Sequence, residues 1–285
     1  MSEAANAGML EFWNGDAGQK WVRFQERMDV SLAPFGHKAM DVAGLADGAK
    51  VIDVGCGCGD TSFELARRVG ETGSVLGVDI SEPMLARARE RAQATGVDTV
   101  AFRQADAQVQ TFDESAYDAV FSRFGVMFFE DPVTAFRNLK SALKPGGRIG
   151  FACWQPAKDN PWVRIPVGVA KQYVEMPAPP GPDDPGEFAF GDPDRVRRIL
   201  SEAGFADIVI DKLDMPIAVA GGTGLDAAVE FLTQMGPTAR ALAEANVGDD
   251  AKARMMADLR EALVPYDTDD GVVMQSGTWI VSARA

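Results

Sequence analysis

The chain has 285 residues, of which 46% are hydrophobic and 25% charged, the composition of a globular protein long enough to bury a core. Its 42 acidic and 28 basic residues give a net charge of −14, and no run of Lys and Arg is interleaved with aromatic residues, which argues against nucleic acid or an anionic membrane as a partner. No apolar stretch reaches the roughly 18 residues of a membrane span, and no basic segment precedes a hydrophobic one at the N-terminus, so we expect a cytoplasmic protein.

Cysteine and histidine are scarce. Cys56, Cys58 and Cys153 agree with a reducing compartment. Cys56 and Cys58 form a C-x-C pair, but no further Cys or His stands at ligand spacing and the only histidine is His37. We therefore expect no metal site and interpret the pair as small residues that fill a turn.

The first 45 residues predict helices that precede the first strand and can cover a ligand. Residues 12–18 read as a turn flanked by aromatic residues, residues 19–28 as a helix, and a second helix runs from Ser31 or Pro34 to Val42. Trp13 and Trp21 are candidates for apolar walls beside the ligand, or equally for packing anchors of the cap. Arg23 is a candidate partner of a ligand carboxylate.

A glycine-rich turn follows the first strand. Residues 51–54 form an apolar strand, Gly55, Gly57 and Gly59 follow, and a helix begins at Asp60. Glycines let backbone approach a ligand closely, and the helix behind them offers unpaired N–H groups. The spacing is not the G-x-G-x-x-G of dinucleotide sites, and the acid at the helix start would repel a pyrophosphate, so a ligand with positive charge fits better.

Two further strands also end at acids. Residues 74–79 form a strand that ends at Asp79, which lies 26 positions after Asp53, the length of one strand-helix-strand unit. A carboxylate there can accept both hydroxyls of a ribose. Ser81 caps the next helix, where Ile80 and Met84 can pack on a flat ring, and a third strand at residues 99–103 leads to Asp106.

The chain then continues in the same alternating pattern. A fourth strand at residues 117–121 runs into the segment 122–129, a helix starts at Asp131, and Pro145 to Gly147 stop it before a fifth strand at residues 148–154. A capped helix from Asp192, a sixth strand at residues 205–213 and an antiparallel last strand at residues 272–283 complete the pattern.

Two insertions interrupt this tail. The first contains Trp162, a helical stretch to Val174 and a stiff loop at residues 177–182 that is rich in proline. The second predicts two helices between residues 220 and 268. Loops at the carboxyl ends of strands carry specificity, so we interpret these insertions as a substrate lid, with a homodimer surface as the alternative.

The turn from Asp53 to Gly59, together with Asp79, Asp106, the segment after the fourth strand and the turn 144–147, resembles the class I S-adenosylmethionine-dependent methyltransferases of small-molecule type. The match is close over about residues 46–154. The resemblance implies an α/β fold with a Rossmann-like, doubly wound, seven-stranded sheet, mainly parallel with an antiparallel last strand. It divides the chain into a helical cap at 1–45, the cofactor-binding core at 46–154, an insertion at 155–187, a continuation of the core at 188–218, a helical lid at 219–268 and the last core strand at 269–285.

The resemblance also implies a cofactor, S-adenosylmethionine, whose product is S-adenosylhomocysteine, and transfer of its methyl group to a small molecule by in-line displacement. The residues that would meet the cofactor are Trp21, Asp53, Gly55, Cys56, Gly57, Asp79, Ile80, Met84, Asp106, Ala107, Ser122 and Arg123. The acceptor pocket would be lined by Trp13, Phe124, Trp154 and Trp162.

The sequence leaves the chemistry at the acceptor open. His37, Arg123 and Tyr173 are candidates for a catalytic group, although a thiol, selenide, arsenic(III) or amine acceptor would need little or no base. Two alternatives are an NAD-dependent oxidoreductase, which Asp79 also permits, and a protein that binds S-adenosylmethionine without turnover.

Overall fold

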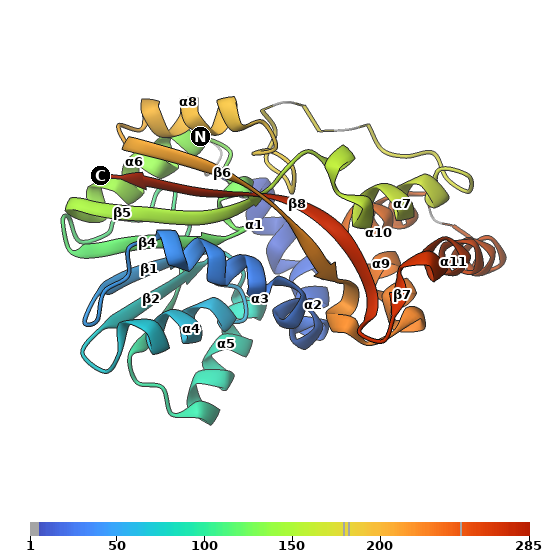
Figure 1. Cartoon of the computed structure of the whole chain (residues 1–285), viewed down its shortest axis with the longest axis horizontal. Helices are drawn as coiled ribbons and strands as arrows, with labels where there is room; N and C mark the ends of the chain where they lie inside the picture. The colour runs from blue at the N-terminus through green and yellow to red at the C-terminus, as the bar shows by residue number, and fades with distance from the viewer. Residues whose placement is uncertain (1–5, 179, 182, 246) are drawn as a thin grey trace.

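A computed structural model describes residues 6–178, 180–181, 183–245 and 247–285, so residues 1–5 of the predicted cap and Pro179 and Pro182 of the predicted stiff loop lie outside it. Seven strands join in the order β3-β2-β1-β4-β5-β8-β6 (Figure 1). The first five strands run parallel and β8 lies antiparallel between β5 and β6, which confirms the predicted fold class. The strands are β1 Lys50–Val54, β2 Ser74–Asp79, β3 Val100–Gln104, β4 Tyr117–Arg123, β5 Leu143–Trp154, β6 Ala206–Ala218 and β8 Gly271–Arg284; a short β7, Asp267–Thr268, pairs with β8.

Helices cover both faces of the sheet. On one face lie α3 (Gln25–Val42), α4 (Asp60–Val69) and α5 (Glu82–Thr95), and on the other lie α6 (Pro132–Ala142) and α8 (Pro193–Glu202) (Figure 1). Asp131 and Asp192 cap α6 and α8 by accepting hydrogen bonds from backbone N–H groups, and a proline follows each cap. The central strands are buried on both faces, as Ile52, Phe121 and Ile149 show.

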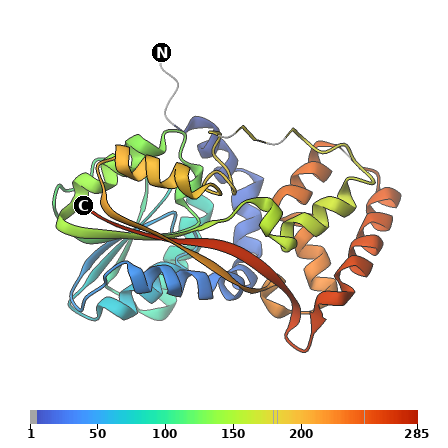
Figure 2. The same ribbon diagram turned by 45° about the horizontal axis from the view of Figure 1, so that its top comes forward.

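Strands β6 and β8 extend beyond the sheet as a two-stranded ribbon. β5 pairs with residues 278–284 of β8, whereas residues 273–277 pair only with residues 214–218 of β6. At the far end of the ribbon lie η3 (Val219–Gly222), α9 (Leu225–Gln234), α10 (Gly236–Glu244), α11 (Asp249–Leu263) and η4 (Val264–Tyr266). Helix α7 (Pro161–Ala170), which follows η2 (Ala157–Asp159), packs against α10 and α11, and together these helices form a separate layer at one end of the molecule (Figure 2).

The prediction of two helices in residues 220–268 is wrong. Gly236 has φ = 74°, a left-handed conformation, and Pro237 lacks an N–H, so the helical pattern breaks there and a third helix starts.

The N-terminal helices also differ from the prediction. Helices α1 (Ala7–Asn14) and α2 (Asp16–Arg23) occupy the predicted turn and are separated only by Gly15. Pro34 lies inside α3 instead of starting a helix, because α3 begins at Gln25 and buries a long face.

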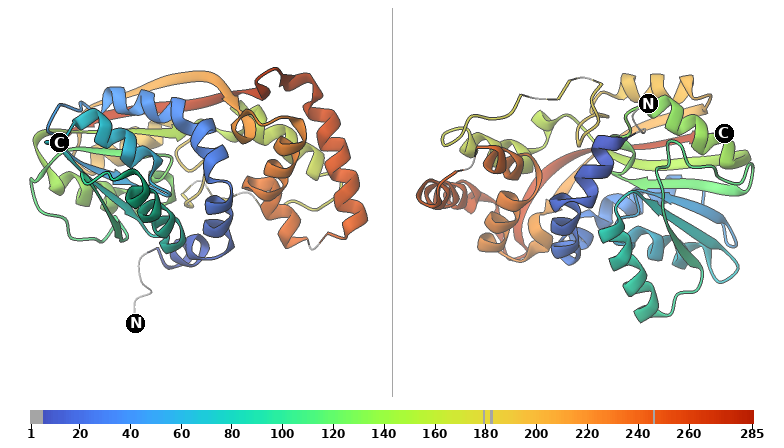
Figure 3. Two further views of the ribbon diagram at one scale, coloured as in Figure 1. Left: turned by 90° about the horizontal axis from the view of Figure 1, so that it is seen from below. Right: turned by 180° about the vertical axis from the view of Figure 1, so that it is seen from behind.

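The N-terminal helices touch the helical layer of residues 219–268, which is called the lid layer below after its predicted role. The Ser31 hydroxyl donates to the Ala218 carbonyl at 2.6 Å and accepts from the Gly221 N–H at 2.9 Å. Arg23 and Arg27 of the N-terminal helices pair with Glu230 of α9, at 2.9 and 3.1 Å. Helices α1 and α2 therefore lie between the sheet and the lid layer, and α3 runs from them along the sheet (Figure 3). No helix in the described ranges is long and apolar enough to cross a bilayer.

Candidate active site

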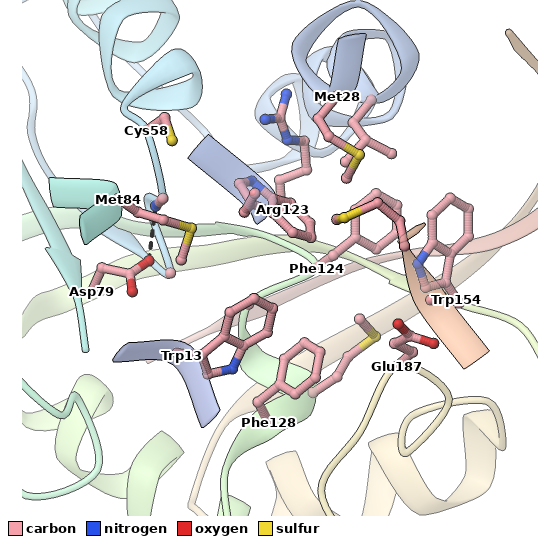
Figure 4. Close-up of a pocket in the computed structure, with 18 of the residues that line it drawn as sticks. Trp13, Met28, Cys58, Asp79, Met84, Arg123, Phe124, Phe128, Trp154 and Glu187 are labelled. Carbon is pink, nitrogen blue, oxygen red and sulfur yellow. Dashed lines mark hydrogen bonds between the residues drawn. The ribbon is translucent and has the colours of Figure 1, made fainter. Parts of the chain in front are cut away.

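A large cleft opens at the carboxyl ends of the strands, where the strand order reverses between β1 and β4. This is the position at which open α/β sheets bind ligands. The cleft encloses about 1700 Å³, its open mouth included. Side chains from the cap, the strand ends and the lid line it, so that one space joins a polar half beside the glycine turn to an apolar half beneath the lid (Figure 4).

The glycine turn forms a cradle in the polar half. Gly57 has φ = 53°, and a Cβ atom at this position would point into the cleft at 3.8 Å from both the Trp21 indole nitrogen and the Met84 sulfur. Gly55 has φ = 68°, and a Cβ there would come within 2.8 Å of the Gly125 Cα. The turn after β1 and the loop after β4 therefore touch through their backbones, and this close approach requires glycine at position 55.

Asp79 holds this turn in place. Its Oδ2 accepts the Gly57 N–H at 2.8 Å and its Oδ1 accepts the Ser81 N–H at 2.9 Å (Figure 4). Burial raises the pKa of the carboxyl, while these backbone donors lower it. Each carboxylate oxygen has a second lone pair, so Asp79 keeps capacity to accept hydroxyl groups from a ligand in the cleft.

Asp53 and Ser122 do not line the cleft, and their predicted contact with a cofactor is not supported. Asp53 is fully buried behind the turn, where its Oδ2 accepts the hydroxyls of Thr61 and Ser62 at 2.7 and 2.6 Å. Its Oδ1 has no hydrogen-bond partner among the described residues, and burial raises its pKa to about 6. The Ser122 hydroxyl donates to the Val54 carbonyl at 2.8 Å. Both residues position the turn and the start of α4.

Asp106 lies at the far edge of the polar half beside Asn6, a residue that the sequence analysis missed. The Asn6 amide nitrogen donates to Asp106 Oδ2 at 2.8 Å, and the Gln108 N–H donates to Asp106 Oδ1 at 2.9 Å. Asn6 also exchanges hydrogen bonds with Glu130, since its N–H donates to the carboxylate at 2.9 Å and its Oδ1 accepts the Glu130 N–H at 2.8 Å. A buried asparagine thus ties the start of the described chain to two loops of the cleft.

A charged cluster lies at the other edge of the turn. Arg123 pairs with Asp60 at 2.8 Å and Arg91 pairs with Asp29 at 3.0 Å. Burial and the charge of Asp60 raise the pKa of Asp29 to about 6, while both arginines lower it. Arg123 therefore lines the cleft as predicted, whereas Arg23, the predicted carboxylate partner, lies outside it and pairs with Glu230 and Gln234.

Aromatic side chains build the apolar half. Phe124 and Trp154 stack with ring centres 4.0 Å apart, and Trp162 leans on Trp154 at 5.0 Å. Trp13 meets Trp21 and Phe128 edge to face at 5.7 and 5.2 Å. All four predicted acceptor-pocket residues line the cleft, joined by residues from the cap, the lid and the segment after β4: Met28, Leu32, Met127, Val163, Ile217, Val219, Phe231, Leu232, Met235 and Thr238.

Two catalytic candidates do not line the cleft. His37 is exposed on α3, and the Tyr173 hydroxyl donates to Asp258 of α11. His37 is a candidate because it is the only histidine of the sequence and belongs to the predicted cap, and neither fact places its side chain at the cleft.

Glu187 is the most informative residue that the sequence analysis missed. It lines the apolar half although it belongs to a loop with no strand or helix pattern. Only the path of the segment between α7 and α8 brings it there. The remaining predicted cofactor residues, Trp21, Gly55, Cys56, Gly57, Ile80, Met84 and Ala107, all line the cleft.

The cysteines are buried, free and held neutral. Burial raises the pKa of Cys58 to about 12, and it raises the pKa values of Cys56 and Cys153 as well. Within the described part of the chain, no three His, Cys, Asp or Glu side chains are grouped to hold a metal.

Fold and cleft together define a Rossmann-like α/β protein with a ligand site at the switch point of its sheet. Residues 45–162 match the family described as a methyltransferase domain. Aklanonic acid methyltransferase DauC of Streptomyces sp. (strain C5) is 34% identical over 127 residues, covering 44% of this chain and 58% of DauC. Nocamycin O-methyltransferase of Saccharothrix syringae is 31% identical over 184 residues, covering 61% of this chain and 65% of that protein.

A solved structure shares the fold over most of the chain. The YcgJ protein of Bacillus subtilis superimposes with a TM-score of 0.55 at 18% identity, covering 87% of this chain and 97% of YcgJ. The chain spans less than two thirds of the length of the two curated relatives above. Over residues 45–162, the chain is therefore similar to methyltransferase domains, as the resemblance of its glycine turn and strand ends predicts.

Proposed function

We propose that this protein is an S-adenosylmethionine-dependent methyltransferase whose acceptor is a small, largely apolar molecule. The observation that carries the proposal is the continuity of the cleft, in which the glycine turn and an aromatic pocket share one space. Trp and Met side chains line this continuous space.

The residues of the polar half suit S-adenosylmethionine. When bound, this cofactor supplies a methyl group on a positively charged sulfur. Asp79 would accept the ribose hydroxyls of the cofactor, and Ile80 and Met84 would pack on its adenine ring. The glycine turn at Gly57 would leave room for the cofactor to pass close to the backbone. The Asp29, Asp60 and Arg123 cluster offers acids for an amine and a guanidinium for a carboxylate.

The chain's own contribution to the reaction is alignment and exclusion of water. Cap and lid meet above the cleft through Ser31 and through the pairs of Arg23 and Arg27 with Glu230. A closed apolar site that orients the acceptor removes much of the entropic part of the barrier.

An NAD-dependent oxidoreductase is not favoured, because the turn lacks the G-x-G-x-x-G spacing and an acid, Asp60, stands at the start of α4.

The test is calorimetric titration of the purified protein with S-adenosylmethionine, S-adenosylhomocysteine and NAD in parallel. We expect the first two to bind and NAD not to bind. Asp79→Ala should weaken the binding of S-adenosylmethionine by about 1.5 to 3 kcal/mol, because a charged acceptor of two hydroxyls is lost. Asp98→Ala, which removes an exposed acid, is the matched control. Binding of NAD alone, or of none of the three, would refute the proposal.

A further inference from the structure

One acid stands apart from all other charged residues of the cleft. The charged side chains that line the described cleft are Asp29, Asp60, Asp79, Asp106, Arg123 and Glu187, and the first five surround the glycine turn. Glu187 lies in the apolar half, beside Trp154 and across the cleft from Asp79 (Figure 4). A charged group among aromatic and methionine side chains is costly, so its presence calls for a chemical reason.

Among the described residues, Glu187 has no hydrogen-bond or ion-pair partner through which it would stabilise the fold. Its carboxylate makes no hydrogen bond or ion pair with any residue that the structure describes. Its backbone is nevertheless held, because the Gly186 N–H donates to the Met127 carbonyl at 3.1 Å and the nearby Phe190 is buried. The backbone is thus held at the wall of the pocket, and the carboxylate lines the cleft.

The surroundings of Glu187 bring the pKa of its carboxyl close to neutral pH. Burial raises the pKa of Glu187 to about 7, and Arg240 of α10 lowers it only in part. Arg240 is itself paired with Glu244 at 2.8 Å, and Asp183, on the same segment as Glu187, is paired with Arg195 of α8. A carboxyl that gains and loses a proton near neutral pH is suited to accept a proton from a substrate.

We propose that the Glu187 carboxylate accepts the proton of a hydroxyl group on a flat aromatic acceptor that lies against the Phe124, Trp154 and Trp162 wall. The inference rests on the proposed methyltransferase function. In this step the O–H bond breaks, its proton moves to Glu187, and its electron pair forms the bond to the methyl carbon, while the sulfonium sulfur keeps the electrons of the broken C–S bond. The step needs no oxidant or reductant.

The aromatic rings offer the acceptor a flat apolar surface. Phe124 and Trp154 stack at 4.0 Å with their planes 10° apart, so each ring covers only one face of the other. The Trp162 N–H donates to Asn160 at 2.9 Å, so it is not available to the ligand. The Trp162 N–H is therefore no donor for the acceptor, and Glu187 is the charged residue that lines this part of the described cleft.

The test measures binding of three naphthalene probes to the protein loaded with S-adenosylhomocysteine. The probes are 2-naphthol, its ether 2-methoxynaphthalene and the cation 1-naphthylmethylamine. We expect the preference for 2-naphthol over the ether to grow about tenfold between about pH 6 and about pH 8, because ionisation of Glu187 creates the acceptor of the hydroxyl proton. Glu187→Gln should remove this pH dependence while leaving the affinity for S-adenosylhomocysteine unchanged. Glu175→Gln, an exposed acid of the same loop, is the matched control and should behave as the wild type.

The outcomes separate this inference from the proposed function. Failure to bind S-adenosylhomocysteine would overturn both. If it binds, then a preference that does not change with pH, a Glu187→Gln variant that matches the wild type, or no binding of any probe would overturn the role of Glu187 alone. Tightest binding of the ammonium probe would instead identify Glu187 as a counter-ion for a cationic acceptor and would equally overturn the inference.

Discussion

Replacing Glu187 by Gln should make the protein more stable above neutral pH. The pKa of this carboxyl rises from its ordinary value of 4.5 to about 7 on folding, because burial disfavours the charged form. A carboxyl whose pKa is higher in the folded state stabilises that state fully at pH values below its pKa in the unfolded chain. This stabilisation is lost as the pH rises from 4.5 through about 7. The ionised wild-type protein therefore carries a cost that a neutral Gln side chain avoids.

The size of this cost follows from the shift. At about 1.36 kcal/mol for each pKa unit, the full rise corresponds to about 3 kcal/mol of unfolding free energy. Because the side chain is only partly buried and faces the cleft, where water screens it, we expect about half of this amount. As the pH rises from about 5.5 to about 8.5, the free energy of unfolding of the Gln variant should increase by about 1 kcal/mol relative to that of the wild type.

Urea denaturation followed by tryptophan fluorescence measures the difference. Wild type, Glu187→Gln and the control Glu175→Gln are compared at both pH values, so that the titration of all other groups cancels. Parallel pH dependence of the wild type and Glu187→Gln, or a variant that loses stability relative to the wild type as pH rises, would refute the reasoning. It would mean that the Glu187 carboxyl is solvated or paired.

Three further predictions concern the cleft and its cover. Gly57→Val should abolish binding of S-adenosylmethionine, because the side chain would enter the cradle and would demand a left-handed φ of 53°; normal affinity in a titration would mean that the ligand does not pass this turn. Asn6→Ala should lower the free energy of unfolding by about 1 to 3 kcal/mol, since it leaves partners at Asp106 and Glu130 unpaired, and thermal unfolding at constant pH measures this loss. Arg23→Ala should leave the affinity for S-adenosylmethionine unchanged and cost less than about 1 kcal/mol of stability, because its pair with Glu230 is exposed; a clear loss of affinity would restore Arg23 as a ligand residue.

The sequence by itself determined the sheet and the polar half of the cleft. Alternating apolar strands and capped helices reproduce the bounds of β2 and the start of α4, and Asp79 and Asp106 both reach the cleft because parallel strands share one edge. Gly57, Asp79 and Asp106 lie where their positions in this pattern predict. These are local signals, since each depends on a strand end or a turn within a few residues.

Asp53 and Ser122 show the limit of such signals. Both stand at strand ends as predicted, yet Asp53 turns its side chain toward Thr61 and Ser62, and Ser122 toward Val54, behind the cleft. Side chains alternate between the faces of a strand, so a shift of one residue decides between the cleft and the core.

The four predicted aromatic residues line the apolar half, but only the tertiary structure brought its other side chains to them. Glu187 comes from a loop, Met235 from the junction between α9 and α10, and Thr238 from α10, and no period in the sequence links them. They converge because the ribbon of β6 and β8 carries α9 to α11 past the sheet, and because Ser31 and Arg27 fasten the cap to that lid. Such long-range contacts depend on how whole elements pack. The position of Glu187, to which we assign the proton of the acceptor, was therefore visible only in the folded chain.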